Sequence, residues 1–200
     1  MKFSSVALAV AASIGLVACA GTETVYDESY RKTQIDGFYD DGAGGRDLKL
    51  IVFGNPFAIP QDKFARVVEE DLRDAPLTSR QETHPLLTPG PTAKPIYRLV
   101  YVFNPTGGLF GNAICRHGLK AEANDDFPPA AMPTPTTPTS HIVATAAFCV
   151  EYRAVTEVSG QVDAASPGDV QFYRLTRQMM AEVFRPDVHW DQNAQPMRNP

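Results

Sequence analysis

The pattern of apolar and polar positions divides the chain from about residue 47 onward into four strands and two helices. Strands are expected where short apolar runs, rich in β-branched and aromatic side chains, stop at turn residues: 48–53, 96–103, 142–150 and 154–162. Residues 61–73 carry apolar side chains at helical spacing with charged ones between them, which predicts an amphipathic helix. The last two strands are close enough along the chain to form a hairpin.

The second helix has a recognisable start signal. Ser166 is expected to cap it, Pro167 to occupy its first position, and Asp169 to reach back to the cap. Its predicted buried stripe consists of Phe172, Leu175, Met179 and Val183.

The order strand, helix, strand, strand, strand, helix predicts an α/β fold. We expect a two-layer sandwich in which two helices cover one face of an approximately four-stranded mixed sheet. The predicted organisation is a signal peptide (1–18), a flexible tether (19–46), a single domain (47–186) and a polar C-terminal tail (187–200). Most of the 17 prolines lie in two stretches near 75–95 and 105–138, which are expected to be surface excursions.

The N-terminus has the pattern of an export signal. Lys2 precedes an apolar run over residues 6–17, which is too short for a transmembrane helix of about 20 residues. The run ends in Leu16-Val17-Ala18-Cys19, which resembles a bacterial lipobox. The resemblance implies cleavage before Cys19 and a diacylglyceryl group on its sulfur. A cleaved secretory peptide with a chance cysteine is the alternative. Ala20 after the anchor, by analogy with enteric bacteria, suggests the outer membrane.

The two remaining cysteines, Cys115 and Cys149, are expected to form a disulfide, because an exported protein folds in an oxidising space. Closing a loop of about 35 residues would contribute roughly 4 kcal/mol of stability in the chain-entropy estimate. The alternative is a metal site in which His117 and His141 join the two cysteines. The Cys-x-His spacing of Cys115 and His117 is not that of a zinc finger, so we predict no metal and no cofactor.

Composition and motifs do not favour catalysis or nucleic-acid binding. The formal net charge is −5 and the isoelectric point is near 5.3, whereas a nucleic-acid-binding domain is expected to be basic. The chain has no Gly-x-Ser-x-Gly nucleophile motif, and its glycine-rich segments 42–45 and 107–111 lack the lysine of a phosphate-binding loop. No catalytic residue is therefore predicted, and a periplasm-facing hydrolase or solute-binding domain is kept as the alternative function.

Two of the expected strands end in similar turns, Gly54-Asn55-Pro56 and Asn104-Pro105. If these strands are parallel neighbours, Asn55 and Asn104 lie at their carboxyl edge, where open α/β sheets bind ligands. Leu109 and Phe110 are expected to be exposed there among glycines. We regard these four residues as a possible partner contact, with ordinary turn chemistry as the alternative.

The lipobox, the polar tether and the short α/β domain resemble small envelope lipoproteins of Gram-negative bacteria. Four further motifs resemble uncharacterised alphaproteobacterial lipoproteins: Gly44-Gly45-Arg46-Asp47-Leu48, Gly54-Asn55-Pro56-Phe57, Tyr97-Arg98-Leu99-Val100 and Phe103-Asn104-Pro105. The resemblance implies a lipid-anchored, periplasm-facing protein but no particular activity. We expect a non-enzymatic adaptor, or an accessory of assembly or transport, that binds a protein or a glycolipid.

Overall fold

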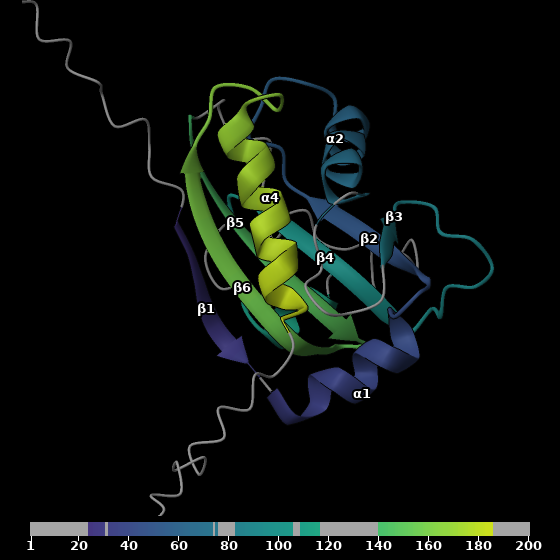
Figure 1. The fold of residues 1–200 in the computed structure, drawn as a ribbon. Helices are drawn as coiled ribbons and strands as arrows, with labels where there is room; N and C mark the ends of the chain where they lie inside the picture. The colour runs from purple at the N-terminus through teal and green to yellow at the C-terminus, as the bar shows by residue number, and fades with distance from the viewer. Residues whose placement is uncertain are drawn as a thin grey trace, which may run out of the picture.

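The computed structural model describes residues 24–30, 32–73, 75, 83–105, 109–116 and 140–185. These residues form an α/β fold in which helices pack on a mixed sheet (Figure 1). In chain order the elements are β1 (Thr24–Tyr30), α1 (Lys32–Gly42), β2 (Asp47–Phe53), α2 (Gln61–Arg73), β3 (His84–Leu86), β4 (Tyr97–Phe103), β5 (His141–Val150), β6 (Arg153–Asp163) and α4 (Val170–Val183). The predicted signal peptide, the proline-rich tract at 128–138 and the predicted tail at 187–200 lie outside the described residues.

The six strands of the described residues are ordered β1-β6-β5-β4-β2-β3. β2 runs parallel to both β4 and β3, and the other neighbours are antiparallel. The α/β class and the β5–β6 hairpin are confirmed, but the sheet has two strands more than predicted. β3 was missed because it is only three residues long and contains Pro85, which disfavours a strand assignment.

The main core lies between the sheet and the helices. Side chains alternate along β4, so that Tyr97, Leu99, Tyr101 and Phe103 face this core while Val100 and Val102 face the other side. α2 contributes Phe64, Val68 and Leu72, and α4 contributes its whole predicted stripe. All seven residues of β4 are buried, as expected of a central strand covered on both faces.

The segment predicted to be a flexible tether belongs to the domain over its described residues. β1 pairs antiparallel with β6 at the edge of the sheet, and α1 buries Ile35 and Tyr39 in the main core. The Tyr39 hydroxyl lies 2.8 Å from Oγ1 of Thr83, and its ring lies 5.2 Å from that of Phe184. The prediction failed because the polar, glycine-rich composition outweighed two apolar side chains four residues apart, the spacing of one helix face.

The start of α4 also differs from the prediction. The cap is Asp169, whose side chain accepts a hydrogen bond of 2.9 Å from the backbone N–H of Gln171. Ser166 instead opens a turn, in which its carbonyl accepts from the N–H of Asp169 at 3.1 Å. Both residue types cap helices well, and Pro167 suits the second position of a turn as well as the first of a helix.

Candidate functional site

The two Asn-Pro turns lie at the same edge of the sheet, as predicted, because β2 and β4 are parallel neighbours. The Asn55 side chain makes its hydrogen bonds within its own turn. Its Oδ1 accepts from the N–H of Phe57 at 3.0 Å, and its Nδ2 donates to the carbonyl of Ile59 at 2.5 Å. Asn55 is 9% exposed and shapes the entry to α2 rather than a contact surface.

Asn104 instead bonds to the neighbouring strand β5. Its backbone N–H donates to the carbonyl of Val143 at 2.7 Å, and its Oδ1 accepts from the Val143 N–H at 2.9 Å. Its φ of +48° lies in the left-handed region, which asparagine tolerates better than most residues. Asn104 thus extends the β4–β5 ladder by one position through its side chain, and its side-chain oxygen serves the sheet rather than a contact surface.

Leu109 and Phe110 separate into two roles. Leu109 is 5% exposed and packs with Ile51, Phe53 and other apolar side chains on the face of the sheet opposite the helices. The prediction that Leu109 is exposed was therefore wrong, since an apolar side chain beside an uncovered sheet face is favourably buried there. Phe110 is 52% exposed, so of the four predicted contact residues it is the one with a large apolar surface in solvent.

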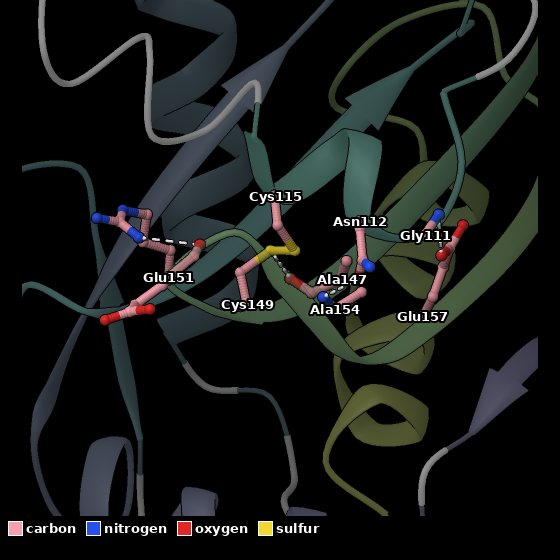
Figure 2. Close-up of a disulfide and its surroundings, with 9 residues drawn as sticks. Gly111, Asn112, Cys115, Ala147, Cys149, Glu151, Ala154 and Glu157 are labelled. Carbon is pink, nitrogen blue, oxygen red and sulfur yellow. Dashed lines mark hydrogen bonds between the residues drawn. A yellow bond between two sulfur atoms is a disulfide. The ribbon is translucent and has the colours of Figure 1, made fainter.

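Residues 109–116 are held on this second face by a disulfide and two hydrogen bonds (Figure 2). Cys115 and Cys149 are bonded, as predicted, with Cα atoms 5.5 Å apart and both side chains buried. Oδ1 of Asn112 accepts from the N–H of Ala154 at 2.9 Å. The N–H of Gly111 donates to Oε2 of Glu157 at 2.5 Å. Phe110 is thus presented by a segment with fixed geometry.

Several polar side chains are buried beside this segment. The hydroxyls of Thr145 and Ser159, a cross-strand pair on β5 and β6, lie 3.1 Å apart. Nη1 of Arg98 donates to the carbonyl of Glu151 at 3.4 Å. These contacts stabilise strand ends and cross-strand pairs, and no catalytic triad can be assembled from them.

A second polar group lies between α2, α4 and β4. The Tyr101 hydroxyl donates to the carbonyl of Thr176 at 2.9 Å, and Oγ1 of Thr176 lies 3.3 Å from Oδ2 of Asp71. Burial raises the pKa of Asp71 to about 6, and the nearby Glu70 adds to the shift while Thr176 and Arg177 oppose it. Burial also raises the pKa of the Tyr101 hydroxyl well above its usual range.

A third polar group fastens α1 to the start of β4. Asp41 pairs with Lys94 and accepts a hydrogen bond of 2.6 Å from the hydroxyl of Tyr97. These contacts lower the pKa of Asp41, while burial and the carboxylate together raise the pKa of Tyr97 to about 12. This group has a structural role, because the polar atoms of Asp41, Lys94 and Tyr97 bind one another.

Sequence reasoning missed two exposed apolar surfaces. Ile96 and Tyr152 lie at one end of the sheet, where the N–H of Glu151 donates to the carbonyl of Ile96 at 2.7 Å. Val170 and Tyr173 lie on the outer side of α4 and are 54% and 38% exposed. The sequence could have indicated that Val170 and Tyr173 are exposed, since both residues fall outside the buried stripe of that helix.

Comparisons with protein families, curated proteins and solved structures found no match. Within the described residues, no helix has the length and hydrophobicity needed to cross a membrane. No group of three or more His, Cys, Asp or Glu side chains suited to a metal ion occurs in that same part of the chain.

Proposed function

We propose that this protein is an exported lipoprotein of the bacterial envelope, anchored through Cys19 in the outer membrane and facing the periplasm. It acts as a non-enzymatic adaptor or accessory that binds another envelope component, a protein or a glycolipid. The observation that carries the proposal is the buried Cys115–Cys149 disulfide, because such bonds persist in oxidising compartments and are rare in the cytosol. The sequence Leu16-Val17-Ala18-Cys19 supports the lipid anchor.

The variant Cys19→Ser tests the proposed lipid anchor. Two or more acyl chains give stable membrane attachment, at about 0.8 kcal/mol for each buried methylene, and the variant loses them all. We expect the protein to move from the membrane pellet to the soluble fraction or to remain as an uncleaved precursor in the inner membrane. Ser13→Ala, within the same apolar run, is the control and should leave the protein in the outer membrane. Outer-membrane partitioning of Cys19→Ser that equals that of the parent protein would refute the anchor.

Phe110 supports the proposed binding of a partner. Its large apolar side chain is exposed on a segment that the Cys115–Cys149 disulfide holds in place, and such a side chain is a favourable contact for another molecule. We expect Phe110→Ser to reduce the yield of crosslinked partner in intact cells, measured by crosslinking and mass spectrometry. Its thermal stability should stay close to that of the parent protein, since little buried surface is lost. Phe110→Tyr is the matched control that keeps the ring. An undiminished set of crosslinks in Phe110→Ser would remove Phe110 from the contact surface.

A further inference from the structure

The strand that follows the proposed anchor begins at the same end of the molecule as α4. Thr24, the first residue of β1, pairs with Gln161 near the end of β6, and α4 starts shortly after β6 at Val170. β1 and α4 are also in contact. Figure 1 shows the end of β6 and the start of α4 in the upper part of the view, with β1 beginning lower, at the left edge of the sheet beside β6.

The chain between the proposed anchor and this end is short. Five residue steps separate Cys19 from Thr24, and a fully extended chain covers at most about 3.5 Å per step, or about 17 Å in total. This limit holds for every conformation of the connecting residues. β5 alone, with ten residues, is about 30 Å long. The end of the domain that carries Thr24 therefore cannot rise from the lipid surface by more than about half the length of its own sheet.

The surface of α4 at this end has side chains suited to lipid headgroups. Val170 and Tyr173 are exposed, Arg174 is exposed beside them, and the Arg177 guanidinium lies over the Tyr173 ring at 4.8 Å. Residues 170–181 contain these two arginines and no carboxylate. Tyrosine is enriched at the membrane–water interface, and arginine binds phosphate with its planar guanidinium.

We propose that the short connection holds the domain against the membrane and that the outer surface of α4 formed by Val170, Tyr173 and Arg174 contacts the headgroup layer. The inference rests on the proposed acylation of Cys19. It deepens that proposal by assigning an orientation: the α4 surface faces lipid, and the β5–β6 turn with Tyr152 points away from it.

The test uses the acylated full-length product in vesicles of phosphatidylethanolamine and phosphatidylglycerol that contain a headgroup spin-labelled lipid as quencher. A fluorophore is attached to Val170→Cys or, as the matched control at the far end of the sheet, to Tyr152→Cys. Both positions are exposed, whereas Cys115 and Cys149 are bonded and buried and do not react. We expect the probe at position 170 to lose most of its fluorescence and the probe at position 152 to keep most of it.

A third variant tests the role of the short connection. A Gly-Ser segment of about 20 residues inserted between Glu23 and Thr24 adds a root-mean-square span of roughly 25 Å. We expect quenching at position 170 to fall toward the value at position 152. Unchanged quenching in this variant would contradict a contact held by the short connection.

The mass of the N-terminal peptide, measured on the same preparation, separates the two proposals. Acylated Cys19 with equal quenching at positions 170 and 152 overturns the membrane contact and leaves the proposed function intact. Cys19 without an acyl group overturns the proposed anchor, and the membrane contact with it.

Discussion

The carboxyl group of Asp71 is held at the junction of α2 and α4, where burial raises its pKa to about 6. The groups around it are Thr176, Glu70, Arg177 and, through Thr176, the Tyr101 hydroxyl. The pKa in the folded state lies above the value of 3.8 in the unfolded chain, so the folded state binds the proton more tightly. The contribution of this group to stability is full below pH 3.8 and is lost as the pH rises through 6.

We therefore predict that Asp71→Asn raises the free energy of unfolding at pH 7 by about 1 kcal/mol, a value reduced for the solvent screening of a partly exposed group. The gain in unfolding free energy should shrink as the pH falls from 7 toward 4, because the parent carboxyl is then protonated and therefore uncharged, like the amide of the variant. Urea unfolding at a series of pH values measures both effects. Asp62→Asn, an exposed carboxyl on the same helix, is the control and should give no such gain. A pH-independent difference between Asp71→Asn and the parent would contradict the assignment.

For single residues, the sequence predicted where a residue lies in the fold better than what its side chain binds. Asn55 and Asn104 lie at the predicted edge, yet the Asn55 side chain bonds within its own turn and the Asn104 side chain bonds to Val143 on β5. Whether an asparagine side chain binds its own backbone or a partner depends on distances of a few tenths of an ångström, which residue order does not encode. Leu109 shows the same limit, because its burial depends on a sheet face built from strands far away in sequence.

Among the elements, α1 is attached to the sheet by a close approach that only glycine permits. A Cβ atom added at Gly42 would lie 2.3 Å from Cγ of the Tyr97 ring, and that ring is fixed by Asp41 and by stacking with Phe148. No real side-chain contact is that short, so either the ring or the end of α1 would have to move. The packing of α1 thus depends on the absence of a side chain at one position.

We predict that Gly42→Ala lowers the free energy of unfolding by about 1–3 kcal/mol, the usual cost of overpacking a core. Gly37→Ala is the matched control in the same helix, since a Cβ there meets nothing within 4 Å. The control should be neutral or more stable by up to about 1 kcal/mol, because alanine favours helix over glycine. Equal stability of the two variants in chemical denaturation would indicate that α1 does not pack as described.

The elements that sequence reasoning found are those with long, uniform patterns. α2 and α4 carry a helical period, β2 and β4 are apolar runs, the β5–β6 hairpin joins two segments of strand-like composition, and all of these elements are present. β1 and α1 were missed because their side chains are mostly polar, and β3 because it is short and contains Pro85. Their places are set by partners elsewhere: β6 for β1, Tyr97 and Phe184 for α1, and β2 for β3. Tertiary pairing overrode local composition in all three.

For the whole molecule, most of the predicted tether belongs to the folded domain, and a disulfide closes a long loop of that domain. A tether of 28 residues was expected, but the fold takes up all but the first few of them, so an anchored domain would be held close to the lipid. The disulfide fastens the second face of the sheet by linking residues 34 positions apart, for roughly 4 kcal/mol of stability. The odd number of cysteines is consistent with one buried pair and one acylated residue.

The most direct test of export and lipid anchoring is the intact mass of the protein purified from membranes, measured after treatment with a thiol-alkylating reagent and before any reduction. We predict a chain that begins at Cys19, carries the added mass of a diacylglyceryl group, and bears no alkylation on Cys115 or Cys149. A chain that retains residues 1–18 or has an unmodified Cys19 would contradict the anchor. Alkylation of Cys115 and Cys149 in the folded protein would contradict the disulfide on which the proposed export rests.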